Sequence, residues 1–310
     1  MKNFLISILL LFSPFIFAQE ENFVLHTKTG DIFGTIAVPR SEKQMPLVLL
    51  IAGSGPTDRN CNQPFLQTNA FKMLTDSLLK NNIATLRFDK RGIAESIAAG
   101  SNEIDLRFEN YISDVQAFID TLAKDKRFSK IIVAGHSEGA LIGLIASENN
   151  PKVAKYISIS GTALPADEII KLQLAAQPQE VKDLIFPILD SLKIGKTVEN
   201  VPQMLYALFR PSVQPYMISW IKYNPQKEIA KLTIPILIIQ GTTDIQVFEN
   251  QADLLHSANN NSTLCKIENM NHVLKTCQTT EQTAQLATYT NPNLPLVNGF
   301  VKCIVDFVKK

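Results

Sequence analysis

The sequence lacks any excess or clustering of charge. Its 310 residues carry 30 Lys and Arg against 29 Asp and Glu, and no long basic run stands anywhere in the chain. Surfaces that bind nucleic acids or anionic membranes need concentrated basic side chains. The composition, 45% hydrophobic and 19% charged, is globular and excludes a disordered or collagen-like chain. We therefore expect neither nucleic acid nor a charged membrane surface as a partner.

Long apolar runs are also scarce, and the one marked run stands near the start. Residues 4–18 (FLISILLLFSPFIFA) follow Lys2 and contain no charge. The run is shorter than the roughly 20 residues that span a bilayer, and it ends in a small residue before Gln19, which is typical of a signal peptide. The alternative is an uncleaved anchor. We expect residues 1–18 to be removed, leaving an exported, periplasmic or secreted protein with no stable membrane insertion.

Cysteines are few, and their spacing matches no CxxC metal motif. Cys265, Cys277 and Cys303 lie close enough in the chain to form one disulfide, whereas Cys61 stands alone. Export permits a disulfide, but a chain of this length folds without one, so free buried thiols are equally compatible with the sequence. An HExxH motif is also lacking, and we expect no metal ion and no cofactor.

Short apolar runs alternate with helical patterns along the rest of the chain. The runs occupy residues 47–52, 83–88, 131–134, 153–160, 236–239 and 263–267. They are apolar on both faces, which is typical of parallel strands covered by helices. Helical spacing of apolar residues follows in the segments 71–79, 111–122, 137–148 and 300–308. With an antiparallel hairpin at 23–27 and 32–39, these patterns predict an α/β fold with one mostly parallel sheet flanked by helices.

The segment from about 162 to 232 interrupts this alternation. It contains seven prolines among Leu- and Ile-rich helical stretches and no convincing strand. We interpret it as a helical lid insertion within a single domain spanning 19–310, the alternative being a small second domain. Its bulky side chains can line an acyl pocket or form the core of the lid. The candidates for substrate contact are Tyr206, Phe209, Met217, Trp220 and Tyr223.

The pentapeptide Gly135-His136-Ser137-Glu138-Gly139 stands directly after one predicted strand and directly before a helix. In this context G-x-S-x-G forms a sharp turn that exposes the serine above the sheet at a helix N-terminus. The context favours Ser137 as a nucleophile over a purely structural glycine turn.

A serine nucleophile needs a base and a carboxylate that orients it. His272 follows the last predicted strand and Asp244 follows the strand at 236–239, so both lie on the carboxyl edge of the sheet, where α/β proteins gather functional groups. The chain order Ser137, Asp244, His272 is that of α/β-hydrolases. Glu249 is the reserve carboxylate.

An oxyanion hole requires two backbone N–H donors. The position after the nucleophile assigns one to Glu138, and the loop Gly53-Ser54-Gly55-Pro56 after an early strand assigns the other to Ser54. The same loop resembles the start of a dinucleotide-binding fingerprint, but Asp58 occupies the third glycine position and would repel a pyrophosphate.

Four stretches carry a family resemblance: AGSGPTDR at 52–59, RFDKRG at 87–92, GHSEG at 135–139, and residues 208–232 leading into IPILIIQGTTD. The chain resembles the α/β-hydrolase superfamily, and within it secreted bacterial carboxylesterases grouped with serine aminopeptidase-like (S33-type) hydrolases. The resemblance implies the triad and oxyanion donors named above, and cofactor-free hydrolysis of short-chain esters. One departure is Asn60-Cys61-Asn62, where such enzymes often carry an acidic residue and glycine. Within RFDKRG, Arg87, Asp89 and Arg91 are interpreted as a structural charge network.

The function expected from these observations is cleavage of small carboxylic esters through an acyl-enzyme. An aminopeptidase, an amidase or an acyltransferase would use the same triad, because nucleophile and fold do not set the substrate. A non-catalytic binding protein on a hydrolase scaffold is the alternative of another class. The oligomeric state has no signal in the sequence.

Overall fold

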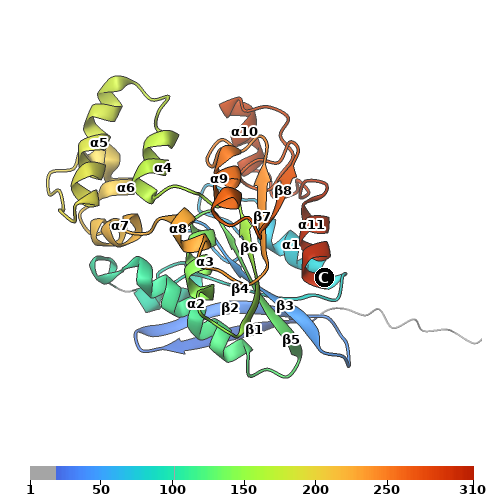
Figure 1. Ribbon diagram of the computed structural model, residues 1–310. Helices are drawn as coiled ribbons and strands as arrows, with labels where there is room; N and C mark the ends of the chain where they lie inside the picture. Colours follow the sequence, from blue (N-terminus) through green and yellow to red (C-terminus); the bar gives the residue numbers. More distant parts are fainter. Residues whose placement is uncertain (1–18, 101) are drawn as a thin grey trace, which may run out of the picture.

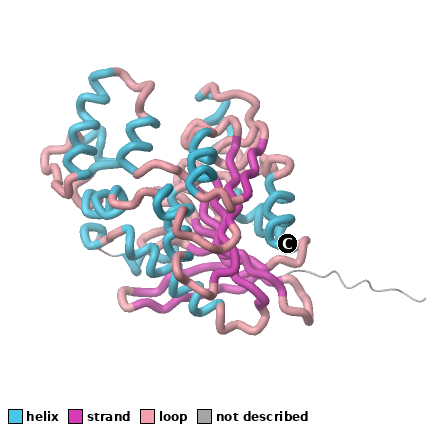
Figure 2. Tube along the Cα trace, in the orientation of Figure 1, coloured by secondary structure: helices cyan, strands magenta, loops and turns pink. Residues whose placement is uncertain are grey.

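The structure is a computed structural model that describes residues 19–100 and 102–310. Its centre is an eight-stranded sheet of order β1-β2-β4-β3-β5-β6-β7-β8, which runs through the molecule with helices on both sides (Figure 2). The predicted signal peptide, residues 1–18, lies outside the described residues. Among those that are described, no helix combines the length and apolar character needed to cross a bilayer.

The sheet begins with two antiparallel strands, β1 (Gln19–Thr27) and β2 (Gly30–Val38), joined by a tight turn at Lys28-Thr29. β2 also pairs antiparallel with β4. Every further pairing in the sheet, from β4 through β3 to β8, is parallel. The remaining strands are β3 (Met45–Ile51), β4 (Ala84–Phe88), β5 (Phe128–His136), β6 (Val153–Ile159), β7 (Ile236–Gly241) and β8 (Thr263–Ile267).

Apolar side chains of the central strands alternate between two cores. On β3, Leu47 and Leu49 belong to the core beneath α2 (Phe108–Leu122) and α3 (Glu138–Ser147), whereas Val48 and Leu50 belong to the core beneath α1 (Ala70–Leu79) and α11 (Phe300–Lys309). Because successive strand residues point to opposite faces, a run that is apolar throughout is covered on both faces. The predicted mostly parallel α/β sheet is therefore confirmed.

One strand differs from the expectation of burial on both faces. β8 pairs only with β7 and ends the sheet, and Thr263 at its start is exposed. An edge strand has a neighbour on one side only, so part of it reaches solvent. Two helices near this edge are α9 (Asn250–Ala258) and α10 (Gln282–Tyr289), and the sequence patterns had not located α10.

The insertion between β6 and β7 is helical in the described structure. Its elements are α4 (Ala166–Gln173), α5 (Gln179–Lys193), the 3-10 turn η3 (Gln203–Leu205), α6 (Tyr206–Phe209), α7 (Gln214–Ile221) and α8 (Pro225–Ile229). Two further 3-10 turns, η1 (Ala94–Gly100) and η2 (Glu103–Asp105), lie between β4 and α2. In Figure 1, α4–α7 gather beside the α2 and α3 face of the sheet. Ile169, Leu189 and Phe209 of the insertion share one core with Leu47 of the sheet.

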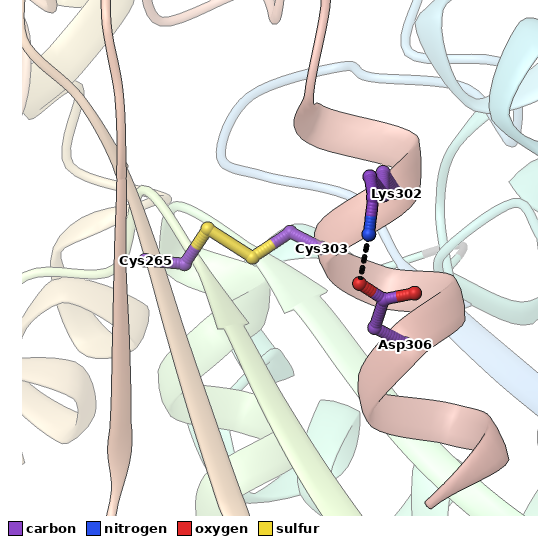
Figure 3. Close-up of a disulfide and its surroundings, with 4 residues drawn as sticks. All are labelled: Cys265, Lys302, Cys303 and Asp306. Atoms are coloured by element: carbon purple, nitrogen blue, oxygen red, sulfur yellow. Dashed lines mark hydrogen bonds and ion pairs between the residues drawn. A yellow bond between two sulfur atoms is a disulfide. The ribbon is translucent and has the colours of Figure 1, made fainter.

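A disulfide between Cys265 and Cys303 ties the edge strand β8 to the last helix, α11 (Figure 3). Cys61 and Cys277 are free and buried. Of the pairings that the sequence left open, the structure thus selects Cys265 with Cys303. The bridge closes a separation of 38 residues, and it fastens a helix that covers one face of the sheet to one of the two edge strands.

Candidate functional site

Ser137 occupies a turn between β5, which ends at His136, and α3, which begins at Glu138. Its backbone has φ 54° and ψ −121°, a conformation rare for residues other than glycine. The turn is possible because its flanking glycines carry no side chain. A Cβ on Gly135 would overlap the carbonyl of Gly139, and a Cβ on Gly139 would overlap the carbonyl of Ile51. The tight turn leaves Ser137 partly exposed at the carboxyl edge of the sheet.

His272 and Asp244 are joined by a hydrogen bond of 2.8 Å between Nδ1 and Oδ2. Both side chains are buried. A carboxylate oxygen accepts, so Nδ1 carries the proton and the Nε2 lone pair of the neutral ring is left to act as a base. The other oxygen of Asp244 accepts from the amides of Gln246 at 2.8 Å and Val247 at 2.9 Å.

Asp244 remains ionised in this setting. Burial raises its pKa, but the positive charge that His272 carries when protonated and the hydrogen bonds from His272, Val247 and Gln246 outweigh burial, so the pKa lies below its ordinary value. An ionised carboxylate fixes the tautomer of the imidazole and stabilises its cation. Glu249, the reserve carboxylate, instead forms a surface ion pair with Lys266 at 3.0 Å.

Ser137 and His272 line one cavity, with about 490 Å³ of free space that includes open solvent at its mouth. Its walls come from the loop after β3, the elbow, the loop after β8 and the end of α10. The lining residues are Gly53, Ser54, Thr57, Cys61, Gln63, Leu66, Thr68, Ala70, His136, Ser137, Gln246, His272, Val273, Leu274 and Tyr289. The mixed polar and apolar walls suit a small ligand with a polar group near Ser137.

Of the two backbone amides expected to stabilise an oxyanion, one belongs to Ser54, which lines this cavity, and the other to Glu138, which directly follows Ser137. Glu138 is the first residue of α3, and the first amides of a helix have no partner within it. Ser54 is exposed and lines the cavity. The loop behind Ser54 is fixed, since its carbonyl accepts from the Thr57 hydroxyl at 2.7 Å. The role of these two amides as oxyanion donors stays a prediction.

The candidates for substrate contact do not line this cavity, and four of the five make contacts within the fold. Phe209 and Met217 are buried in the core, Trp220 stacks on Phe108 with a centroid distance of 6.0 Å, and Tyr206 lies on an exposed helix. Tyr223, offered with them, donates to Glu109 at 3.1 Å. Helical spacing identifies an apolar stripe but not the element that covers it, and here the stripes pack onto α2 and the rest of the insertion.

The charged residues of RFDKRG form internal pairs, as expected. Arg87 donates to Asn60 at 2.8 Å, Asp89 accepts from Arg59 at 2.6 Å, and Arg91 pairs with Asp114 at 2.5 Å. These contacts tie the loops after β3 and β4 to each other and to α2.

The unusual segment Asn60-Cys61-Asn62 keeps an ordered loop. Cys61 has φ 66°, in the left-handed region that favours glycine. The carboxylate of Asp58 accepts from the amides of Asn60 and Asn62, both at 2.8 Å, and the side chain of Asn62 accepts from the amides of Thr68 and Asn69. The loop therefore retains its shape through side-chain hydrogen bonds and contributes Cys61 to the cavity wall.

No sequence pattern indicated Gln246 and Tyr289 as cavity residues. The Gln246 side chain donates to the Tyr289 hydroxyl at 2.9 Å, although 43 positions separate them. The only local signal for Gln246 is its position two residues after Asp244. Among the described residues no three His, Cys, Asp or Glu side chains converge as a metal site.

His136 supports the loop that carries His272. Its Nε2 lies 2.8 Å from the carbonyl oxygen of His272, which can only accept, so Nε2 carries the proton. The two rings lie 4.7 Å apart. Burial and the neighbouring charge of His272 lower the pKa of His136 to about 3. His136 is therefore a neutral donor over the whole neutral range. The other two histidines lie elsewhere, His26 beside Asp31 and His256 beside Ser262.

This buried histidine makes folding sensitive to acid. Its folded pKa of about 3 lies below the unfolded value of about 6.5, so the unfolded chain binds more protons between these limits and stability falls as pH falls through them. We expect His136 to contribute a loss of about 2 kcal/mol in the free energy of unfolding between pH 7 and pH 5. Urea titrations of wild type and His136→Gln at both pH values isolate the effect, and equal pH dependence in the two proteins would contradict it.

The chain is similar to a known family model and to a curated esterase. The family model described as serine aminopeptidase, S33, matches residues 67–208. The chain is 26% identical over 254 residues to the esterase EstD of Thermotoga maritima, covering 78% of this chain and 57% of that protein. The chain thus spans little more than half the length of this curated relative.

Solved structures share the fold at low identity. Est1E from Butyrivibrio proteoclasticus, solved with ferulic acid bound, superposes with a TM-score of 0.61 at 16% identity over 93% of this chain and 96% of that one. An esterase of Pyrococcus furiosus has a TM-score of 0.58 at 14% identity over 94% and 91% of the two chains. By its sheet and its likeness to these structures, the chain has the α/β-hydrolase fold, and it is similar to the S33 family model and to esterases.

Proposed function

We propose that this protein is a serine hydrolase that cleaves small carboxylic esters. The observation that carries the proposal is one cavity lined by Ser137 and His272, in which the histidine is bound through Nδ1 to the buried, ionised Asp244. A strained, partly exposed serine beside an oriented imidazole is the arrangement that nucleophilic catalysis requires. The esterase relatives support ester hydrolysis as the reaction.

In the proposed reaction, each step is carried out by a named residue. Nε2 of His272 removes the Ser137 proton as Oγ attacks the ester carbonyl carbon, and the amides of Ser54 and Glu138 bind the resulting oxyanion. The tetrahedral intermediate expels the alcohol, which takes the proton from the imidazolium and leaves an acyl-enzyme. Water, deprotonated by His272, then attacks the acyl carbonyl, and Ser137 leaves with that proton. Ester and water become acid and alcohol, with no cofactor in the cycle.

Substitution of the triad tests these roles. We expect Ser137→Ala to lower kcat by about 10⁴-fold or more and Asp244→Asn by about 10⁴-fold, because the first removes the nucleophile and the second leaves the imidazole in the wrong tautomer. Hydrolysis of p-nitrophenyl acetate measures the loss, and circular dichroism checks the fold. Glu249→Gln is the matched control and should retain wild-type turnover. Full activity in Ser137→Ala would refute the proposal.

A second candidate is cleavage of an amide or peptide bond. The matching family model is described as a serine aminopeptidase, and the same triad can attack an amide. We place ester hydrolysis first because the relatives described above are esterases. An acyltransferase would show itself by transfer to an added alcohol, and a non-catalytic binding protein would bind esters without turnover.

A substrate panel separates these candidates and tests acyl length. The cavity is small and includes the polar groups of Gln246 and Tyr289, so we expect acetyl to butyryl p-nitrophenyl esters to exceed decanoyl esters in kcat/KM. Each methylene that fits would add about 0.8 kcal/mol of burial, so a deep groove would instead give rates that rise steadily with length. Aminoacyl anilides belong in the same panel, and faster cleavage of them than of every ester would favour the peptidase.

We further propose that the protein is exported, to the periplasm or outside the cell. The apolar run at 4–18 and the Cys265–Cys303 disulfide support this, since disulfides persist in oxidising compartments. The exported protein should begin at Gln19 and, when denatured without reductant, titrate two thiols, those of Cys61 and Cys277. N-terminal sequencing and a thiol count measure both. An intact Met1 or four thiols would count against export.

A further inference from the structure

Lys90 is a buried lysine behind the candidate site that the proposed reaction does not use. It follows β4, and its side chain is 2% exposed. The ammonium lies 2.6 Å from the carbonyl oxygen of Gly53, 2.8 Å from the carboxylate of Glu138 and 5.0 Å from the ring centre of Tyr111. Burying an ammonium is costly unless it is paired and hydrogen-bonded, so a lysine with this set of partners calls for a physical explanation.

The contact with Gly53 acts on the proposed oxyanion hole through a single peptide unit. The Gly53 carbonyl and the Ser54 N–H belong to one planar peptide, and in the trans form they point in opposite directions; no cis peptide occurs among the described residues. An ammonium that fixes the carbonyl therefore fixes the direction of the N–H. It also draws electron density toward the oxygen, which strengthens the N–H as a donor.

The contact with Glu138 reaches the second donor. The carboxylate of Glu138 accepts from Lys90, while the backbone amide of the same residue opens α3 beside Ser137. The two segments are already close, since a Cβ on Gly53 would lie 3.1 Å from the Cβ of Ser137. One ammonium thus joins the loop that carries the Ser54 amide to the residue that supplies the other amide.

The two tyrosines near Lys90 and Glu138 add no charge to this ion pair. Burial and the nearby charge of Glu138 raise the pKa of both Tyr111 and Tyr216, so the two phenols stay protonated and the cluster contains one cation and one anion. Lys90 is also absent from the lining of the cavity in the described part of the chain. It does not touch a substrate there, so any effect on the reaction passes through the backbone that it holds.

We propose that Lys90 is a positioning residue that sets and polarises the Gly53–Ser54 peptide and fixes it to Glu138, so that the two oxyanion donors converge. The inference rests on the proposed ester hydrolysis and extends it to a residue outside the triad. Its expected signature is loss of transition-state stabilisation with little loss of substrate binding.

The experiment compares Lys90→Met, Glu138→Gln and the double variant. Methionine matches the length of lysine but cannot donate, and the double variant leaves no buried charge unpaired. We expect kcat/KM for p-nitrophenyl butyrate to fall about 10- to 100-fold in Lys90→Met and in the double variant, mainly in kcat. This is less than the loss expected for deleting an oxyanion donor outright. Glu138→Gln, which keeps the Lys90–Gly53 contact, should lose less.

The affinities of two inhibitors distinguish a specific effect on the oxyanion donors from a general loosening of the fold. A trifluoromethyl ketone forms an adduct with the Ser137 hydroxyl, and this adduct carries an oxyanion. In each variant its affinity should therefore fall by the same factor as kcat/KM. The ether analogue of the ester, which has no carbonyl, should bind within twofold of wild type. Arg91→Met is the matched control: it breaks the neighbouring pair with Asp114 and should keep kcat/KM and ketone affinity within twofold.

The outcomes separate this inference from the proposed function. Full activity in Ser137→Ala would refute the proposed serine mechanism itself. If Ser137→Ala is inactive but the folded double variant keeps wild-type kcat/KM and ketone affinity, the Lys90 inference is overturned and the mechanism stands. Equal weakening of the ketone and the ether would also overturn it, because Lys90 would then support binding in general. If Lys90→Met does not fold, the double variant decides.

Discussion

The close approach of backbones between the end of β3 and the turn at Ser137 is the constraint on which the site depends. Gly139 lies so near the Ile51 carbonyl that no side chain fits, and Gly135 stands in the same relation to Gly139. This contact allows Ser137 to take a conformation that costs a residue with a Cβ roughly 1–3 kcal/mol. The surrounding structure holds Ser137 in this conformation. β5 is paired on both sides, with β3 and β6, and α3 is buried, so neither end of the turn can move to relieve the strain.

The same closeness determines the electrostatics of the site. Groups packed at the carboxyl edge of the sheet are removed from water, so a charge there needs an opposite charge or several donors. Asp244 has His272 and two backbone amides, and Lys90 has Glu138 and a carbonyl. His136 has no carboxylate among its hydrogen-bond partners and stays neutral. The site thus contains fixed charges in a dry setting, where they act more strongly than in water.

Much of this arrangement was predictable because short, continuous stretches of the sequence determine it. Ser137 lies in a five-residue motif between a strand and a helix, and Asp244 and His272 each follow a strand, so topology alone brings them to one edge. The parallel sheet was predictable because strands covered on both faces are apolar throughout. The exposure of β8 was not, since its five residues do not reveal that it ends the sheet.

The walls of the cavity were beyond prediction because they depend on contacts between distant segments. Tyr289 meets Gln246, and Lys90 meets Glu138 across 48 positions. The place of the aromatic residues of the insertion was not predictable for a related reason. Trp220 packs against Phe108 of α2, and the spacing of residues within α7 does not reveal this partner. The insertion therefore contributes core to the domain, while the cavity wall is made by residues of 53–70, the turn at 136–137, Gln246, the loop at 272–274 and Tyr289 of α10.

This division gives the loop after β3 a large share of the cavity wall, to which the described insertion contributes no lining residue. That loop contributes the Ser54 amide, the side chains of Gln63 and Leu66, and Cys61 to the cavity. It is held at one end by Lys90 on the Gly53 carbonyl and along its length by Asp58 and Asn62. Under the proposed mechanism, a change in the shape of this loop would therefore alter the proposed oxyanion donor at Ser54 and the cavity wall together, because both belong to one hydrogen-bonded segment.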